Sequence, residues 1–430
     1  MDFRKFEIIY IVENNFDLIK QHQLRFVEES WDTQKLGNIC KITMGQSPSS
    51  SNYSENKEDT VLIQGNADLI NGQVVPRVYT SEITKTSKPG DIILTVRAPV
   101  GDLAINEFNS CIGRGVCSIE GDKFIYYFLQ SLKDKHVWER YSQGSTFESI
   151  NSNDIKNLKV KMPSEKTQES ISNFLTRIDV KIRLLEKKYN HYQDFKKFLM
   201  QQIFAQKLRF ADYSDDWKEI TLKDIGTFYR GHSYNSTNVV DNGLLVLRSN
   251  NIQNNVLDFS EDGLQFVDKD CKKELELQKN DIVICMSNGT RSLVGKSAEY
   301  TGNYANKLTV GAFCSIFRTK NKLAKYLFQT ENYKKNLYLI LAGTNINNLK
   351  NTDLERFKFN IPVDESEINK IYDLFTSIDN KIESSQKQLQ EIMVFKKGLL
   401  QQMFVYIFIL KHTILNFCAK ICCIKYFLKS

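Results

Sequence analysis

The sequence predicts an α+β fold in which two globular domains in tandem repeat are separated by two long helices packed as an antiparallel coiled coil. The first observation is that two stretches carry apolar residues alternately four and three positions apart, which is the spacing of a coiled-coil seam. The second is that polar residues beside the seam recur at an offset of 200 (378 − 178), as Ile178-Asp179-x-Lys181-Ile182 and Ile378-Asp379-x-Lys381-Ile382. Such a repeat indicates a duplicated gene segment.

Each predicted helix has its own seam. In the first copy the seam residues are Ile171, Leu175, Ile178, Ile182, Leu185, Tyr189 and Tyr192. In the second copy, where only the serine is polar, they are Ile371, Phe375, Ile378, Ile382, Ser385, Leu389 and Ile392. A helix of about 35 residues, with a rise of ~1.5 Å per residue, is ~50 Å long. We expect apolar residues off the seam to remain available to a partner, namely Phe174, Leu184, Leu374 and Leu399.

The duplication includes the globular domains. Each begins with a Trp, Trp31 or Trp217, followed by Leu five residues later and Gly fourteen residues later. A short apolar strand then follows an acidic residue, and each domain closes with a glycine turn and an alternating strand that stops at proline. These patterns predict that each half is an α+β domain ending in one long helix.

Charge and cysteine content set limits on the function. With 58 Lys and Arg against 51 Asp and Glu, the 430-residue chain has a net charge of +7, which permits nucleic-acid binding without proving it. The nine cysteines form no C-x-x-C pair and have no His at ligand spacing, which favours buried thiols in a reducing cytoplasm. We therefore predict no metal site.

Neither end of the chain predicts a membrane segment. The apolar run from Ile8 to Val12 is too short for a signal sequence. In the tail, Lys411 and Lys420 divide the apolar residues into runs shorter than the ~20 that a membrane span needs. We expect the tail to form an extra packed or poorly ordered helix, outside the repeat.

No catalytic motif is present in the sequence. The window from Gly289 to Ser297 is similar to a phosphate-binding loop, but its two glycines are separated by five residues, not four. The chain also lacks a methyltransferase-type Asn/Asp-Pro-Pro-aromatic tetrapeptide and the Pro-Asp with Glu-x-Lys of the common nuclease core. These observations predict a protein that is not an enzyme.

With these motifs, the chain resembles the specificity subunit of type I restriction-modification systems over residues 17–404. The features that match are the W-x4-L start, the Gly-Ser-Thr-x-x-x-Ile turn, Ile-Asp-x-Lys-Ile, and the helix ends Phe-Lys-Lys-x-Leu-x-Gln-Gln. Their twofold occurrence in the same order is the specific signal. The hydrophobic tail departs from the family pattern.

The resemblance implies two target-recognition domains, each reading one part of a bipartite, asymmetric site in double-stranded DNA. It also implies two methyltransferase subunits docked on the helices, further restriction/translocase subunits, and a bacterial, cytoplasmic complex without a membrane. No cofactor is expected on this chain, because S-adenosylmethionine, ATP and Mg belong to the partner subunits. The implied segments are an N-terminal extension (1–16), domain 1 (17–165), helix 1 (166–210), domain 2 (211–364), helix 2 (365–404) and an atypical tail (405–430).

Candidates for base reading are polar side chains on the loops that differ between the halves, because such side chains match donors and acceptors in the major groove. In the first domain they are Gln46, Ser47, Arg97, Arg114, Gln143, Ser145 and Thr146. In the second domain they are Arg230, His232, Arg248, Asn250, Asn251, Asn288, Arg291, Asn345 and Asn347. The alternative for each is a solvated loop residue, or a structural contact for Arg97 and Arg291, which recur in both halves at the same distance from a Val-Gly pair.

Two other classes of function are open at this point. A non-enzymatic coiled-coil adaptor that binds protein partners would need only the heptads and the mild charge. A self-sufficient nuclease would need cleavage by the purified chain with a divalent metal alone. A salt-dependent gel shift distinguishes a DNA binder from an adaptor, because phosphate contacts make affinity fall steeply with salt.

Overall fold

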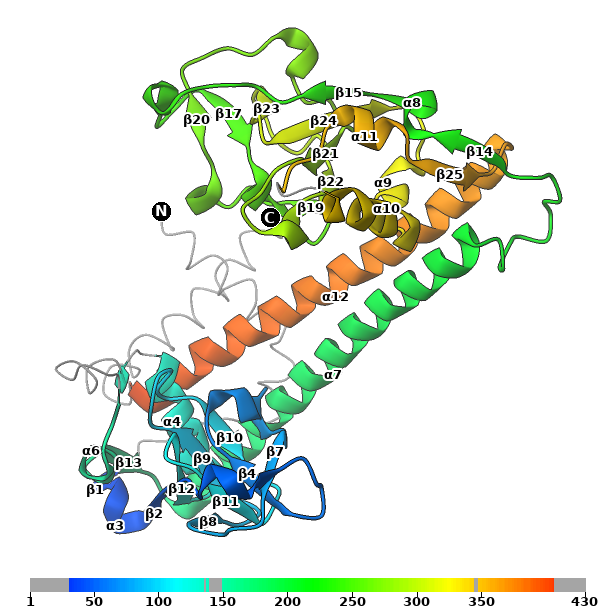
Figure 1. The fold of residues 1–430 in the computed structure, drawn as a ribbon. Helices are drawn as coiled ribbons and strands as arrows, with labels where there is room; N and C mark the ends of the chain where they lie inside the picture. Colours follow the sequence, from blue (N-terminus) through cyan, green and yellow to red (C-terminus); the bar gives the residue numbers. More distant parts are fainter. Residues whose placement is uncertain (1–30, 135–136, 139–148, 344–346, 406–430) are drawn as a thin grey trace, which may run out of the picture. The chain divides into compact units, whose positions relative to one another are not determined.

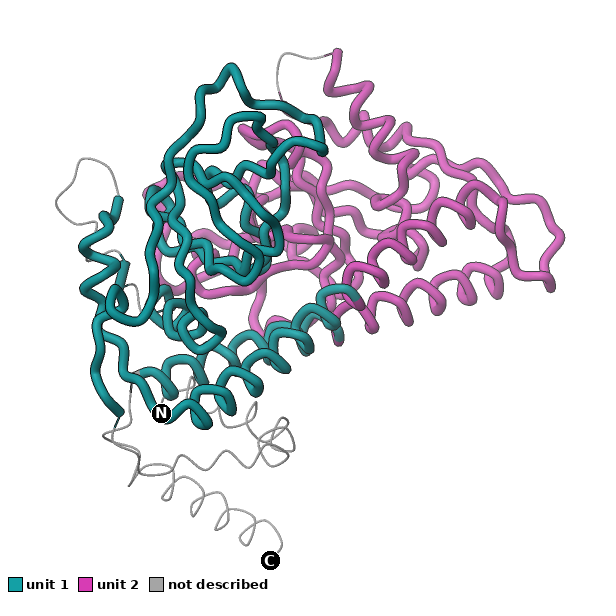
Figure 2. Tube along the Cα trace, turned by 90° about the horizontal axis from the view of Figure 1, so that it is seen from below, with its two compact units in different colours: residues 1–187, 385–430 teal, residues 188–384 magenta. Residues whose placement is uncertain are grey.

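The computed structural model describes residues 31–134, 137–138, 149–343 and 347–405, and the chain divides into two compact units (Figure 1 and Figure 2). Unit 1 combines 1–187 with 385–430, and unit 2 is 188–384. Both boundaries fall inside the long helices, which are α7 (Glu165–Phe204) and α12 (Glu365–Val405). Figure 2 shows each of these helices changing colour partway along its length. Each unit therefore contains one globular domain and one half of each long helix.

The globular domain of unit 1 is built on two mixed β-sheets. The larger has the order β2 (Lys41–Met44), β12 (Val116–Glu120), β9 (Ile92–Thr95), β10 (Leu103–Ile105), β6 (Gln73–Val74), β5 (Leu69–Ile70). The smaller has the order β3 (Tyr53–Ser54), β7 (Val78–Thr80), β4 (Thr60–Ile63), β11 (Ser110–Ile112), β8 (Thr86–Ser87). One pair in each sheet is parallel, β10 with β6 and β11 with β4, and the other pairs are antiparallel.

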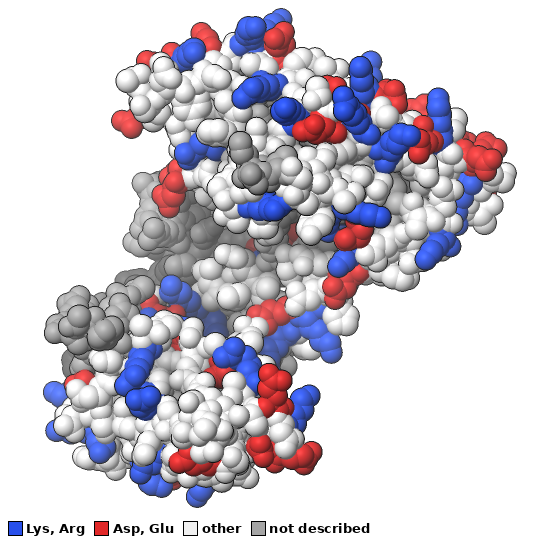
Figure 3. All heavy atoms as spheres, in the orientation of Figure 1, with Lys and Arg blue, Asp and Glu red and all other residues white. Residues whose placement is uncertain are grey.

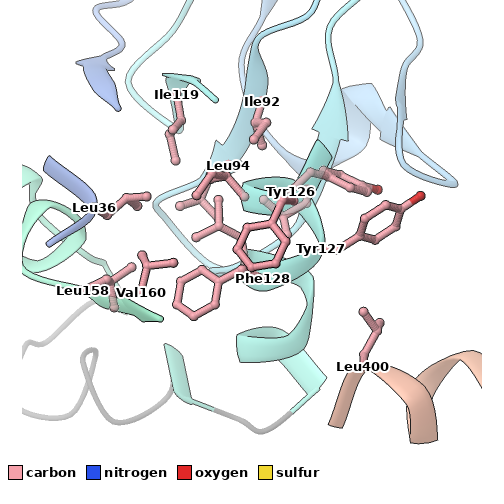
Figure 4. Packing of buried hydrophobic residues seen from close by; sticks show 14 of the residues in the cluster. Leu36, Ile92, Leu94, Ile119, Tyr126, Tyr127, Phe128, Leu158, Val160 and Leu400 are labelled. Carbon is pink, nitrogen blue, oxygen red and sulfur yellow. The ribbon is translucent and has the colours of Figure 1, made fainter. Parts of the chain in front are cut away.

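The core of this domain lies between the larger sheet and the helix α4 (Lys123–Asp134). All four residues of β9 are buried, as expected for a strand covered on both faces. Figure 4 shows side chains of the sheet, of α4 and of α12 converging in this core, with Leu400 contributed by α12. The last part of α12 is thus part of the first domain's core, although it is far away in the sequence.

A third, two-stranded sheet completes the domain. β1 (Asp32–Lys35) pairs antiparallel with β13 (Lys159–Met162), and two short helices flank them, α3 (Leu36–Ile39) and α6 (Ser152–Lys156). In β13 the buried residue Val160 stands between two exposed lysines, which confirms the predicted alternation.

Unit 2 repeats this plan with fewer strands. Its main sheet has the order β15 (Gly226–Arg230), β24 (Cys314–Thr319), β21 (Ile282–Cys285), β22 (Ser297–Glu299). Its second sheet has the order β16 (Val239–Val240), β20 (Phe266–Val267), β17 (Leu244–Leu247), β23 (Leu308–Val310). The remaining elements are two strand pairs and four helices: β14 (Lys218–Thr221) with β25 (Lys358–Ile361), β18 (Ile252–Gln253) with β19 (Val256–Leu257), α8 (Leu222–Ile225), α9 (Ala324–Leu327), α10 (Glu331–Ala342) and α11 (Asn351–Glu355).

The two long helices pack antiparallel. In unit 1, the first half of α7 buries Ile171, Leu175 and Ile178 in the cluster that also holds Ile392 and Leu400 of α12. In unit 2, the second half of α7 packs against the first half of α12 through the buried residues Leu199, Met200, Ile203, Ile371, Phe375 and Ile378. The seam residue Ser385 is buried as well, whereas Tyr189 and Tyr192 are only half-buried.

Two expectations about the helices need correction. Phe174 is buried in the core of unit 1 and is not available to a partner, whereas Leu184 is exposed and Leu374 and Leu399 are half-buried. The first helix also ends at Phe204, before the predicted limit of 210. Gln206 has a positive φ of 54°, and the N–H groups of Lys207 and Leu208 donate to the Gln202 carbonyl, which is how helices commonly terminate.

Within the described residues, no helix is long and apolar enough to cross a membrane. The predicted N-terminal extension (1–16) and nearly all of the atypical tail lie outside the described residues. The helix expected in the tail therefore stays a prediction.

Candidate nucleic-acid interface

Three loops of unit 1 meet at one end of the main sheet, which we name edge 1 (residues 45–47, 96–97, 113–115 and 149). β2 and β9 both run antiparallel to β12, so their C-terminal ends lie beside the start of β12. Gln46 and Ser47 follow β2, Arg97 follows β9, and Arg114 precedes β12. The sheet thus brings together four predicted site residues that are widely separated in sequence.

Backbone hydrogen bonds hold these loops in register. The Gln46 N–H donates to the Ile112 carbonyl at 2.8 Å, and the Arg114 N–H donates to Ser47 Oγ at 3.1 Å. The Val96 N–H donates to the Gly115 carbonyl at 2.8 Å. Because the backbone is fixed in this way, the side chains of Gln46, Arg97 and Arg114 point outward as exposed groups.

A glycine at the start of each edge permits this close approach. A Cβ on Gly45 would lie 2.1 Å from the Gly113 carbonyl oxygen, and a Cβ on Gly231 would lie 2.1 Å from that of Gly311. Any other residue would push the two loops apart. This explains why both halves carry Gly fourteen residues after the Trp.

The predicted glycine turn leads into edge 1. Ser149 forms a β-bridge with Arg97, and the Ile150 N–H donates to the Val96 carbonyl at 3.1 Å. Gln143, Ser145 and Thr146 lie outside the described residues, as does Asn345 in the second half. Their proposed roles remain predictions.

Unit 2 builds the same arrangement, which we name edge 2 (residues 231–232, 286–289, 311–313 and 347–348). The His232 N–H donates to the Val310 carbonyl at 2.7 Å, as Gln46 does to Ile112. The Met286 N–H donates to the Phe313 carbonyl at 2.8 Å, as Val96 does to Gly115. The two edges therefore share a backbone scaffold.

The side chains of edge 2 differ from those of edge 1. Asn288 Nδ2 donates to Ser249 Oγ at 3.0 Å, and Asn347 Nδ2 donates to the Gly289 carbonyl at 3.1 Å. Both asparagines are half-buried, and Asn288 Oδ1 also accepts the Thr290 N–H at 2.9 Å. Arg230 is exposed at the end of β15, next to the edge.

Some predicted site residues of the second domain face inward. Asn251 is 2% exposed, accepts the Arg248 N–H, and donates to the carbonyls of Asp258 and Gly263. Its side chain is thus fully used inside its own loop and is not free to contact a base. Arg248 is half-buried and donates to the Gly263 carbonyl at 3.4 Å, whereas Asn250 beside it is exposed.

His232 is also buried, with 8% of its surface exposed. Burial, assisted by the charge of Lys269, lowers the pKa of His232, so the imidazole is neutral at pH 7. Its backbone belongs to edge 2, but its ring does not reach out from it. A position in a loop had suggested an accessible side chain, which is wrong for this residue.

The spacing match between Arg97 and Arg291 is not a structural match. Gly101 and Gly295, both with positive φ, do occupy equivalent turns. The bridge that corresponds to Arg97 with Ser149 is, however, Ser287 with Asn348. The loop after β21 is longer, and it places Arg291 in an exposed 3-10 turn. The argument that these arginines are structural because they recur therefore fails.

Two residues at edge 2 were missed by the sequence analysis. Ser287 occupies the backbone position of Arg97, and Phe313 is 70% exposed on the turn before β24. Spacing from the end of β21 could have found Ser287. No sequence signal marks Phe313, because a Phe between two apolar strands is typical of a core.

Neither the charge distribution nor the cysteine thiols mark a functional group at edges 1 and 2. Lysines and arginines are intermixed with acidic residues on the face shown in Figure 3. Among the described residues, no group of three or more His, Cys, Asp or Glu side chains could hold a metal ion. Burial raises the pKa of Cys117 and, with a smaller effect of Cys285, that of Cys314 to about 12, so these thiols stay protonated.

Comparisons with known proteins point to one family. Residues 28–191 and 214–394 each match the sequence model of the type I restriction modification DNA specificity domain. A Methanocaldococcus jannaschii protein named as the MjaX specificity subunit is 34% identical over 198 residues, which cover 44% of this chain and 46% of that protein. The MjaVIII specificity subunit of the same organism is 22% identical over 90% of this chain and 94% of its own length. The alignments to the first three relatives span less than half of each relative's length.

The fold is also found among solved structures. The S subunit of the type I restriction-modification system of M. genitalium superposes with a TM-score of 0.59. The superposition covers 89% of this chain and 99% of that one, with 17% sequence identity. At this identity, the likeness concerns the fold.

Proposed function

This chain belongs to the family of the type I restriction modification DNA specificity domain, and from that premise we propose that it is the sequence-reading subunit of a type I restriction-modification complex. Each globular domain reads one part of a bipartite, asymmetric site in double-stranded DNA. The domain limits predicted above, 17–165 and 211–364, are part of this proposal.

One observation carries the proposal: edges 1 and 2 share a backbone scaffold but present different side chains. Edge 1 exposes Arg114, and an arginine donates bidentately to guanine. Edge 2 presents the amides of Asn288 and Asn347, which suit adenine. Two such readers in one chain fit a site whose halves differ.

Further base contacts are proposed at Gln46, Ser47 and Arg97 on edge 1 and at Arg230, Asn250 and Arg291 near edge 2. Gln143, Ser145, Thr146 and Asn345 remain proposed readers on sequence grounds. Backbone phosphates are the alternative target for the arginines, since most protein–DNA contacts go to phosphate and sugar.

Catalysis is assigned to partner subunits, as are S-adenosylmethionine, ATP and Mg. The proposed partners are two methyltransferase subunits and restriction/translocase subunits, assembled in the bacterial cytoplasm. Exposed apolar residues on the long helices support a docking role: Leu184, Phe198 and Met393. An adaptor that binds only protein would not need two edges of one scaffold with different polar side chains.

The test is to map modified adenines in the host genome with and without this gene. We expect one bipartite motif to lose modification when the gene is deleted. The chain purified with its methyltransferase partner should also bind a duplex carrying that motif, with an affinity that falls steeply with salt. An unchanged modification pattern, or binding that is independent of salt, would count against the proposal.

A further inference from the structure

Phe313 is an exposed aromatic residue on a turn of edge 2. It lies in the turn between β23 and β24, with 70% of its surface exposed. Large apolar side chains gain free energy by leaving water, so a ligand that covers this ring gains binding free energy from it.

The turn that carries Phe313 is held on both sides. The Cys314 N–H closes it on the Gly311 carbonyl at 2.8 Å, and the Gly311 N–H donates to the Leu247 carbonyl at 2.8 Å. The Phe313 carbonyl accepts the N–H groups of Met286 and Ser287 at 2.8 and 3.2 Å. The ring therefore projects from a fixed backbone and not from a loose loop.

The loops that adjoin this turn carry a hydroxyl and two amides, and the ring of Tyr234 lies near Gly311 of the same turn. Ser287 is joined to Phe313 through the backbone, and Asn288 follows it in the chain. Asn347 reaches the same loop through the Gly289 carbonyl at 3.1 Å. The turn of Phe313 thus adjoins loops whose polar side chains can read base edges by hydrogen bonds.

Only one base edge in the major groove carries an apolar group, which is the 5-methyl group of thymine. This inference rests on the proposed function: we propose that Phe313 contacts a thymine methyl group in the second half-site. Asparagine amides recognise adenine, the base that pairs with thymine. Edge 2 therefore has the chemistry to read both members of one A·T pair.

The equivalent turn of edge 1 cannot make this contact. The Val116 N–H closes it on the Gly113 carbonyl, so Gly115 stands where Phe313 stands in edge 2. A Cβ on Gly115 would lie 2.1 Å from the Gln64 carbonyl oxygen, which leaves no space for a side chain. The methyl contact is thus confined to the second half-site, and edge 1 presents Arg114 instead.

The test replaces thymine with uracil, which removes the methyl group and leaves every hydrogen-bonding group in place. The complex with the methyltransferase partner is titrated with duplexes in which each thymine of the second half-site is replaced in turn. We expect one replacement to weaken binding about fourfold, the effect of one methyl-sized group. Phe313→Ala should bind the thymine duplex more weakly than the unsubstituted protein does. It should bind the uracil duplex with the same affinity as the unsubstituted protein.

Val363→Ala is the matched control. Val363 is another exposed apolar residue of unit 2. It follows β25, which pairs with β14, the strand that precedes β15. Val363 therefore lies at the opposite end of the main sheet from edge 2. This variant should keep the full preference for thymine. Thermal melting checks that both variants are folded. We expect both to fold, because Phe313 and Val363 are exposed side chains.

The inference is overturned if no thymine replacement affects binding by the complex of unsubstituted protein, if the second half-site has no A·T pair, or if the thymine preference survives Phe313→Ala. Equal loss of affinity on both duplexes would also overturn it, because it would indicate a ring wedged between base steps. A complex that binds no DNA refutes the proposed function itself, and the inference with it. A complex that binds its site but ignores the methyl group refutes only the inference.

Discussion

Lys396 Nζ lies 2.5 Å from Asp179 Oδ1 within unit 1 and 5.4 Å from the ring centroid of Tyr127. Tyr127 itself donates its hydroxyl to Asp179 at 2.7 Å, and burial, followed by the Asp179 charge, raises the pKa of Tyr127 so that this donor stays protonated. Unit 2 contains the same three side chains in the same relation, as Lys196, Asp379 and Tyr326. The repeated Ile-Asp and Phe-Lys-Lys motifs therefore join each pair of helix halves to a globular domain.

We expect Lys396→Met to destabilise unit 1 by about 1–3 kcal/mol. The substitution leaves the Asp179 carboxylate without its cation at a site where the side chains are 11% and 27% exposed. The value lies below that for a fully buried pair, because solvent screens this one in part. Urea unfolding measures the change, and Lys397→Met, at the exposed neighbouring residue, is the control. Equal losses for the two variants would show that the ion pair is not responsible.

Replacing Arg209 by Met should lower the Tm of unit 2 by several degrees. Arg209 donates two hydrogen bonds of 2.8 Å to Glu367, which is buried and also accepts from Trp217 Nε1 at 3.2 Å. Without the guanidinium, a buried carboxylate keeps only one neutral donor. Glu365→Gln, on the exposed face of the same helix turn, is expected to leave the Tm unchanged. A stable Arg209→Met protein would mean that the carboxylate finds another partner.

Asn251→Ala should cost about 1–3 kcal/mol of stability, because it leaves the Arg248 N–H and two carbonyls without their buried partner. Asn250→Ala should cost much less, since Asn250 is exposed and makes one hydrogen bond of 3.3 Å. In DNA binding we expect Asn250→Ala to lower the affinity more than Asn251→Ala does, once each affinity is corrected for the fraction of folded protein. Parallel unfolding and binding titrations of the two variants decide this, and a folded Asn251→Ala protein with altered base preference would refute it.

Arg114→Ala should relax the first half-site, and Asn347→Ala should relax only the second. The two edges belong to domains with separate cores, so their effects should be independent. Each lost base contact is worth about 1–3 kcal/mol of discrimination. Mapping of modified adenines measures both half-sites at once, with Lys159→Ala, an exposed residue of β13, as the control. A change in both half-sites from either substitution would contradict independent reading.

The sequence was informative where structure depends on local spacing. The burial of the seam residues Ile178 and Ile378 could be predicted from the sequence, because a heptad pattern depends only on spacing within one helix. The role of Gly45 could also be predicted as a repeated position, although its cause, the close carbonyl of Gly113, could not. That contact depends on strand pairing between residues far apart in the chain.

Side-chain direction was the main source of error. Asn251 and His232 have the composition and position of loop residues, but both are buried by contacts that only the folded domain makes. Arg291 was misplaced because spacing was counted from a glycine across a loop of different length. In contrast, the place of Phe313 depends on a turn that is bonded to Leu247 of β17 and to Met286 and Ser287 after β21.

The division of both long helices between the units has a consequence for biosynthesis. Unit 2 is one continuous stretch, whereas the core of unit 1 needs Ile392, Leu400 and Met403 from the end of α12. A ribosome makes the chain from its N-terminus, so the first domain to emerge cannot complete its core until nearly the whole chain has been translated. Bringing such distant segments together carries a loop-closure cost that unit 2 does not have. The domain that is translated first is therefore the last to be finished.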